Sequence, residues 1–343
     1  MKNRFFIFTI SIVIILNLFN HTAIANDTAL SAIGDNVGPF SGTPDVIMES
    51  ETINLNIYNN KTTVEVTFYL KNEGKTETIL VGFPDEYASG GIKGQEDFEI
   101  ANIVGPINNF KCWVNGIEQN VSQKNEMVKR IDFNGNERDY KLLWHTWPVT
   151  FDQGKTTIIK NTYQVENGSN VLGEKNFHYT LVTGAKWKGK IGKALITATF
   201  KNNLNTNDIN KDSTTKGIKV LSPQKAYWEL INFEPSAENE TGYFMITFKK
   251  NWIPIIKSRL LTEEDLKDLS EWDLKVLRNE IYARHGRPFK SESLKSYFGS
   301  FDWYKESPSF SDKMLNQFEK QNAQIILNYE KKIGSKLINK DSW

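Results

Sequence analysis

Several side chains near the C-terminus are of types that could bind a ligand or move a proton. The segment Leu277–Gly286 contains two arginines, a tyrosine and a histidine, and the pair Trp303-Tyr304 follows it. A guanidinium can hold a carboxylate with two hydrogen bonds, and an imidazole changes charge near neutral pH. The residues predicted to form a binding site are therefore Tyr282, Arg284, His285, Trp303 and Tyr304.

Catalysis is the less favoured interpretation of these residues. His285 would need a nucleophile or a paired carboxylate arranged with it, and the sequence shows neither. The sequence contains no G-x-S-x-G, H-E-x-x-H or P-loop motif. The single cysteine, Cys112, excludes an intramolecular disulfide and a multi-cysteine metal cluster, and we expect it to be a buried thiol. No catalytic residue, cofactor or metal ion is predicted.

The helix that carries Leu277–Gly286 must place some of its polar groups in a core. Capping boxes at Thr262 and Ser270 predict two helix starts, and Gly286 predicts a left-handed helix end. At about 100° per residue, Arg278 and His285 fall on the apolar face of this helix. A short helix is predicted after Ser291 and a long one from a Ser311 cap to about Ile333, ended by Gly334.

A buried ionic network is the favoured explanation of this pattern. Glu319 and Asn322 fall inside the apolar stripe of the last helix, and a cation buried alone costs several kcal/mol. We therefore predict that Arg278 pairs with Glu319, and that His285 or Asn322 completes the contact. The full predicted structural network is Arg278, Glu280, His285, Glu319 and Asn322. A network of this kind sets helix register without any ligand.

The run Leu277–Gly286 resembles the motif of the YARHG domain. The residues that extend the resemblance are Phe289, Leu294, Tyr297, Phe298, Trp303, Tyr304, Leu315, Glu319, Asn322 and Glu330. The resemblance covers about 262–332. It implies an extracytoplasmic bacterial module at the cell envelope, with no demonstrated ligand or reaction.

From about Asp45 to Lys250 apolar and polar residues alternate with a period of two. Short alternating runs separated by turn residues predict antiparallel sheets packed as sandwiches. Two blocks, 26–121 and 140–250, flank a polar stretch at 122–139 that we expect to be a loop. One elaborated sandwich and two smaller ones both remain open. The fold class predicted is thus multidomain, with an all-β antiparallel sandwich-like N-terminal body and a small all-α C-terminal domain.

Residues 26–250 also resemble a bacterial exported domain of unknown function. The resemblance depends on Asn26–Leu30, on the Asn-Glu-Gly at 72–74 and on the Gly-Phe-Pro at 82–84. It implies location and no activity. A linker at 251–261 then leads to the helical domain at 262–334, and 335–343 form a tail.

The N-terminus predicts an export signal over residues 1–25. Lys2 and Arg4 precede an apolar stretch from Phe5 to Phe19, and Ala23-Ile24-Ala25 suits signal peptidase. The stretch is shorter than the roughly 20 residues of a spanning helix, although uncleaved anchoring is the alternative. The formal net charge of +1 argues against a nucleic-acid partner.

The sequence predicts a protein that is extracellular or associated with the cell envelope, without a membrane span after cleavage. The favoured function is a non-catalytic binding or scaffold module, whose candidate partners are a cell-wall polymer and another exported protein. The alternatives are a wall-acting hydrolase with its site in the β region and a structural spacer without a ligand.

Overall fold

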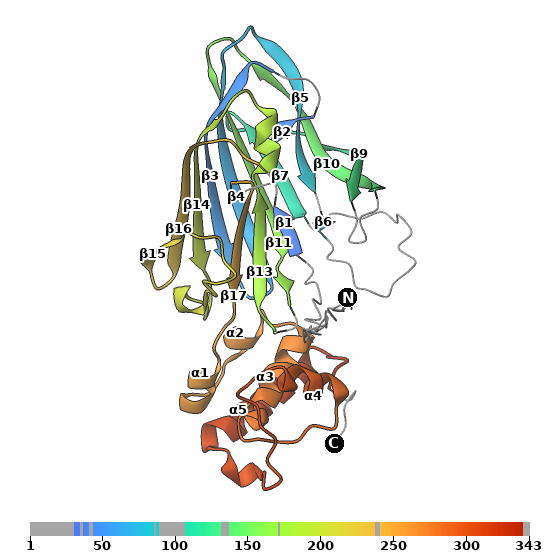
Figure 1. Cartoon of the computed structure of the whole chain (residues 1–343), viewed down its shortest axis with the longest axis vertical. Coiled ribbons are helices and arrows are strands. Elements are labelled where there is room, and N and C mark those ends of the chain that lie inside the picture. Colours follow the sequence, from blue (N-terminus) through green and yellow to red (C-terminus); the bar gives the residue numbers. More distant parts are fainter. Residues whose placement is uncertain are drawn as a thin grey trace, which may run out of the picture.

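Strands dominate the chain between residues 31 and 248, and helices follow from residue 253 (Figure 1). The computed structural model describes residues 31–34, 37–40, 44–85, 87–88, 107–131, 137–170, 172–236 and 241–338. The predicted signal peptide and the motif at 26–30 lie outside these residues, as does the end of the predicted tail.

The largest sheet forms one layer of the β body. Its eight strands lie in the order β15-β16-β14-β3-β4-β11-β7-β8. Their bounds are β3 (Val46–Ile57), β4 (Lys61–Asn72), β7 (Asn108–Val114), β8 (Ile117–Glu118), β11 (Thr156–Glu166), β14 (Ile191–Phe200), β15 (Lys219–Ser222) and β16 (Lys225–Phe233). All neighbours are antiparallel except the parallel pair β14 and β3. Buried residues alternate along β4 and β11, so the sheet turns one face to the core.

Two smaller sheets form the second layer. One has the order β2-β5-β10-β9, and the other has β12-β13-β1-β6 with β17 also on β13. Their bounds are β1 (Ser31–Gly34), β2 (Gly38–Pro39), β5 (Glu77–Asp85), β6 (Tyr87–Ala88), β9 (Ser122–Ile131), β10 (Glu137–Phe151), β12 (Gly168–Ser169), β13 (Lys175–Thr180) and β17 (Tyr243–Phe248). Two short 3₁₀ helices, η1 (Val182–Lys186) and η2 (Thr206–Asp208), interrupt the strand order.

One hydrophobic core joins the two layers. Ile53 and Ile159 reach it from the eight-stranded sheet, whereas Trp147, Phe177 and Ile246 reach it from the smaller sheets. Four tryptophans of the body are at most 5% exposed, namely Trp144, Trp147, Trp187 and Trp228. The described strands therefore form one sandwich, as the alternating sequence pattern predicts for its fold class.

The predicted separation into two β blocks is not seen in this sheet. Strands β4 and β11 come from different predicted blocks, yet they pair from Lys71–Thr156 to Lys61–Glu166. The stretch 122–139 is also not a loop, because β9 occupies Ser122–Ile131 and pairs with β10. Strand β9 lies at the edge of its sheet, where polar side chains can face water on both sides. The polar sequence of this segment therefore predicts a loop, although the segment forms a strand.

The helical domain contains α1 (Ile253–Ser258), α2 (Glu263–Leu266), α3 (Glu271–Ala283), α4 (Glu292–Gly299), η3 (Asp312–Met314) and α5 (Gln317–Lys332). The predicted caps at Thr262, Ser270 and Ser291 are confirmed. The left-handed backbone at Gly286 and Gly334, with φ of 80° and 70°, is confirmed as well. Helix α1 lies within the predicted linker at 251–261.

The predicted start of the last helix at Ser311 is wrong. Ser311 caps the short 3₁₀ helix η3, and the following Leu315 adopts an extended backbone that interrupts the helix. Asn316 caps α5 instead, because its side chain accepts a hydrogen bond from the Glu319 N–H while Glu319 accepts one from the Asn316 N–H. The sequence pattern thus predicts the last helix correctly but assigns its N-cap to Ser311 instead of Asn316.

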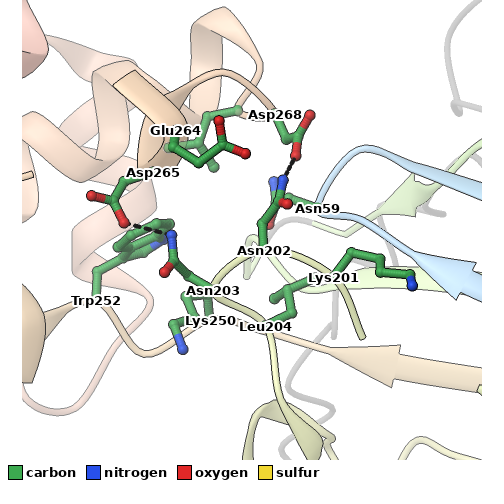
Figure 2. Close-up of a pocket in the computed structure, with 11 residues that line it drawn as sticks. Asn59, Lys201, Asn202, Asn203, Leu204, Lys250, Trp252, Glu264, Asp265 and Asp268 are labelled. Carbon is green, nitrogen blue, oxygen red and sulfur yellow. Dashed lines mark hydrogen bonds between the residues drawn. The ribbon is translucent and has the colours of Figure 1, made fainter. Parts of the chain in front are cut away.

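Polar contacts hold the helical domain against the end of the β body. The Lys175 Nζ lies 2.9 Å from Asp273 Oδ2, and both side chains are largely buried. Figure 2 shows Asn202 and Asn203 of the body directed at Asp268 and Asp265 of the helical domain, with both amides donating to carboxylates. The space between these groups is about 20 Å³, room for about one water molecule. This part of the junction holds the domains together and is too small for a ligand.

Candidate functional site

Arg278 is buried and pairs with a carboxylate of α5. Its Nε donates to Glu330 Oε2 at 2.6 Å and its Nη2 to Oε1 at 3.4 Å. Arg278 is 8% exposed and Glu330 is fully buried. The inward turn of Arg278 agrees with its place on the apolar face of α3, but the predicted pairing with Glu319 is wrong.

The geometry of α5 explains why the partner is Glu330. Glu319 and Glu330 are about three helical turns apart, so they lie on the same face of α5. The face of a helix is readable from sequence, whereas the height at which two helices meet is not. Glu319 lies in the first turn of α5 and meets His285 instead, with 3.0 Å between its Oε1 and the imidazole Nε2.

Asn322 satisfies the backbone ends of α1 and the turn after it. Its amide donates to the carbonyls of Ile256 and Arg259, and its oxygen accepts from the Leu261 N–H at 2.8 Å. Glu280 lies elsewhere and accepts from Arg284 at 2.6 Å. The residues of the predicted network therefore make separate contacts. Arg278 and His285 join α3 and its C-terminal end to α5, and Asn322 joins the end of α1 to α5.

A cleft of about 240 Å³ opens where the β body meets the helical domain. Its lining comes from the chain that follows β17, from α3 and from α4 with the segment after it. The lining residues are Lys249, Lys250, Asn251, Trp252, Glu280, Arg284, Tyr297, Phe301 and Trp303. Aromatic and charged side chains converge in this lining as they do in ligand sites, and the volume is somewhat below the roughly 300–1,000 Å³ usual for such sites.

Arg284 forms one wall of the cleft together with an aromatic ring. Its guanidinium carbon lies 3.6 Å from the ring centroid of Trp303, a close cation–π contact. The Nε and Nη2 atoms donate to a single oxygen of Glu280, at 3.1 and 2.6 Å. The stacking and the ion pair fix the plane of the guanidinium.

Lys249 is the second cation of the cleft. Its Nζ lies 4.6 Å from the ring centroid of Phe301 and donates to the carbonyl oxygen of Leu172 at 2.6 Å. Burial lowers the pKa of Lys249, because the charged ammonium loses water there. Within the described part of the chain no carboxylate lies within 4.0 Å of this ammonium. The neighbouring Lys250, by contrast, has Asp208 at 3.3 Å.

Of the residues predicted to bind, Arg284 and Trp303 line this cleft. Tyr304 packs in the aromatic core of the domain and donates its hydroxyl to the Arg287 carbonyl at 2.7 Å. Tyr282 packs against the core around α3 and α5. His285 faces Glu319, so it turns away from the cleft towards α5.

Sequence reasoning missed Lys249, Tyr297 and Phe301 as parts of the site. Lys249 directly follows the last strand, and only the tertiary fold brings it to α3 and α4. No spacing rule connects it to Arg284. Tyr297 and Phe301 read as ordinary core aromatics of a helical domain, and only the structure shows that they also reach the cleft.

The β body offers buried ionisable groups and no exposed catalytic cluster among its described residues. His145 Nε2 lies 3.3 Å from Asp85 Oδ2, both groups are buried, and Phe110 stacks on the imidazole at 4.5 Å. Cys112 is fully buried, and this burial raises the pKa of its thiol. The described residues contain no group of three or more His, Cys, Asp or Glu that could hold a metal ion.

A family profile and a solved structure both match this chain. The profile of the YARHG domain matches residues 249–331. A protein from Legionella pneumophila whose proposed role is nutrient binding has the same overall fold, with a TM-score of 0.51 and 23% identity over 88% of this chain and 99% of that chain. A comparison with curated proteins gives no match.

A weaker likeness is to an M1 zinc metallopeptidase from Deinococcus radiodurans. It has a TM-score of 0.29 and 9% identity, and it spans 60% of this chain and 42% of that chain. A likeness this low carries no argument about fold or chemistry. Among the residues that the structure describes, no helix is both long enough and apolar enough to cross a lipid bilayer. Residues 249–331 form a YARHG domain, joined to a β body in an arrangement that resembles the Legionella protein.

Proposed function

We propose that this chain is an exported, non-catalytic binding module of the bacterial cell envelope, and that its ligand occupies the cleft of the YARHG domain at its junction with the β body. The ligand is a component of wall material or a segment of another exported protein. The observation that carries the proposal is the cleft itself, where Lys249 and Arg284 meet the rings of Tyr297, Phe301 and Trp303.

The chemistry of the lining favours binding over catalysis. The lining residues include no serine, threonine, cysteine or histidine. The one carboxylate, Glu280, is engaged by Arg284. The phenol of Tyr297 has a raised pKa, first because of burial, so it stays protonated at neutral pH. The ion pair of Glu280 and the protonated phenol of Tyr297 therefore favour binding over acid–base catalysis in this lining.

Three further observations support the proposal. The sequence at 1–25 has the form of an export signal. The YARHG domain resemblance implies an extracytoplasmic module. The Legionella protein of similar fold has nutrient binding as its proposed role, which belongs to the same broad class of function.

The experiment is sedimentation of the mature protein with purified insoluble wall material, and in parallel with immobilised exported proteins. The test variant is Trp303→Ala, and the control is Trp113→Ala, which removes an aromatic side chain that also lies under a cation, Lys160, at 5.9 Å but far from the cleft. We expect Trp303→Ala to weaken binding by at least about tenfold, within the range for losing a central aromatic contact, and Trp113→Ala to bind normally. Circular dichroism confirms that both variants are folded.

Three results would overturn the proposal. Equal binding by Trp303→Ala and the wild type would move the site away from the cleft. Absence of binding to every immobilised material would favour the spacer. Release of soluble wall fragments by the wild-type protein would establish the hydrolase instead.

A further inference from the structure

We infer that the ligand of the junction cleft presents a singly charged anionic group, of the carboxylate kind, beside a flat ring or sugar face. The inference rests on the proposed function and gives the chemistry of the ligand that the same cleft binds. It follows from the charges, the unused hydrogen-bond donors and the aromatic rings of the lining residues.

The lining carries one positive charge without an ionic partner among the described residues. Lys250 lies 3.3 Å from Asp208, and Arg284 is neutralised by Glu280 at 2.6 Å. Lys249 has only neutral neighbours at short range, which are the Leu172 carbonyl and the Tyr297 hydroxyl. Because the other charges of the lining are paired, the cleft attracts one negative charge.

The surroundings of Lys249 strengthen the binding of a negatively charged group. Burial is the largest influence on its pKa and lowers it. The charges of Glu280, Glu174 and Asp273 act in the opposite direction without contacting the ammonium, and the positive charge of Arg284 lowers the pKa further. An ammonium that has lost water and has no carboxylate in direct contact among the described residues is stabilised by an anion more strongly than an exposed lysine would be. Arg284 lines the same cleft as Lys249, so one anion can contact both cations.

Both cations retain hydrogen-bond donors for such an anion. An ammonium has three N–H groups, and two acceptors are within reach of Lys249, the Leu172 oxygen at 2.6 Å and the Tyr297 oxygen at 3.4 Å. The guanidinium of Arg284 uses Nε and Nη2 for Glu280, so Nη1 is unused among the described contacts. A carboxylate has two oxygens, which can accept from an ammonium and a guanidinium at once.

The rest of the ligand meets aromatic surface. The rings of Phe301 and Trp303 are stacked with centroids 5.6 Å apart, and Phe301 also lies under Lys249. Arg284 covers one face of the Trp303 ring and Lys249 lies over the Phe301 ring, so a ring or sugar of the ligand packs against the parts of these aromatics that remain open. The charged group and the apolar body of the ligand therefore meet adjacent parts of one lining.

A single negative charge fits better than a double one. A phosphate monoester carries between one and a half and two negative charges at neutral pH, because its second pKa is about 6. Its excess charge would lie near Glu280, which repels it. A carboxylate balances Lys249 without that cost, so the geometry favours the carboxylate.

The experiment uses three small probes of matched shape: benzoate, benzyl alcohol and phenyl phosphate. Binding to the mature protein is measured by NMR chemical-shift changes at Lys249, Arg284 and Trp303. We expect benzoate to bind at least about tenfold more tightly than benzyl alcohol, equivalent to about 1.4 kcal/mol, and more tightly than phenyl phosphate. Added salt should weaken benzoate binding and leave benzyl alcohol unaffected.

The matched variants are Lys249→Met and Lys160→Met. The second removes a cation that also lies over a tryptophan, Trp113, on the β body. We expect Lys249→Met to abolish the preference for benzoate over benzyl alcohol and Lys160→Met to retain it. The comparison of probes on the wild-type protein needs no variant, so it stands even if Lys249→Met is unstable.

The inference is overturned if benzyl alcohol binds as tightly as benzoate, if phenyl phosphate binds most tightly, or if benzoate shifts no cleft resonance at its highest soluble concentration. These outcomes are separate from failure of the proposed function. If wall material binds through Trp303 but the probes show no preference for the anion, the binding module stands and its ligand is neutral. If Trp303→Ala leaves binding intact, both proposals fail together.

Discussion

The guanidinium of Arg278 donates to both carboxylate oxygens of Glu330, at 2.6 and 3.4 Å, in the interior of the YARHG domain. The pair connects α3 to the C-terminal half of α5. Its two side chains are 9% and 0% exposed, so each charge depends on the other for its compensation.

Arg278→Met should therefore destabilise the domain by about 3–5 kcal/mol, because it leaves the carboxylate of Glu330 buried without a cation. Chemical denaturation, followed by the helical band in circular dichroism, measures this loss. The control is the double variant Arg278→Met/Glu330→Met, which removes both charges and should recover most of the stability. A double variant no more stable than Arg278→Met would show that the pair contributes through packing instead of charge.

The face of each helix was predictable from sequence, but the pairing across helices was not. Arg278 was expected to be buried and to meet a carboxylate of α5, and it does. Glu319 and Glu330 lie on the same face of that helix, and only the register of α3 against α5 selects between them. Register depends on packing of the complete domain, which no single-helix pattern contains.

Gly286 ends α3 in a left-handed conformation with φ of 80°, and its surroundings also exclude a side chain. An added Cβ would lie 2.9 Å from the Lys305 carbonyl oxygen and 2.8 Å from the Ser307 Cβ. Gly286→Ala should destabilise the domain by about 1–3 kcal/mol. Gly299→Ala is the matched control, since no atom lies within 4 Å of its added Cβ, and it should be neutral or slightly stabilising. Equal thermal midpoints for Gly286→Ala and the wild type would contradict the argument.

Asp265 makes the stability of the helical domain depend on pH in the acid range. Burial alone would raise the pKa of this carboxyl, but two hydrogen bonds from Arg259 at 2.7 Å and two from Thr262 outweigh it and lower the pKa from 3.8 to about 2. A group with a lowered folded-state pKa stabilises the fold above its unfolded pKa, and that contribution is lost as pH falls.

The thermal midpoint of the helical transition should therefore decrease as pH falls from about 4 to about 2, with the loss centred between those values. Asp265→Asn should be less stable than the wild type at pH 7 by about 1–3 kcal/mol, because the ion pair with Arg259 is lost and the amide keeps only one of the two acceptor oxygens. It should also lose less stability on acidification. An unchanged acid dependence in Asp265→Asn would assign the effect to other carboxylates.

The Cys112 thiol should be unreactive in the folded protein. It is fully buried between β-sheet layers, and burial raises its pKa, so the nucleophilic thiolate is scarce. Iodoacetamide at neutral pH should leave the native chain unmodified by mass spectrometry and modify it once in denaturant. Rapid modification of the native chain would reopen a catalytic role for this thiol.

The candidate site shows what a sequence can and cannot reveal. Arg284 and Trp303 were predicted as binding residues because their types and spacing suggested it, and both line the cleft. His285 was grouped with them by proximity in sequence, although it follows Arg284 around the helix end and faces α5. Lys249 lies directly after β17, at the first residue of the segment that matches the YARHG domain, and no local sequence pattern connects it to Arg284.

The most direct test of the binding cleft is fluorine NMR of the mature protein labelled with 5-fluorotryptophan, titrated with soluble fragments of wall material or with the captured exported protein. Each signal is assigned by a single Trp→Phe variant. The account predicts that the resonances of Trp303 and Trp252, which line the cleft, shift on binding while those of Trp113 and Trp228 on the β body stay in place. Shifts confined to tryptophans of the β body would contradict it.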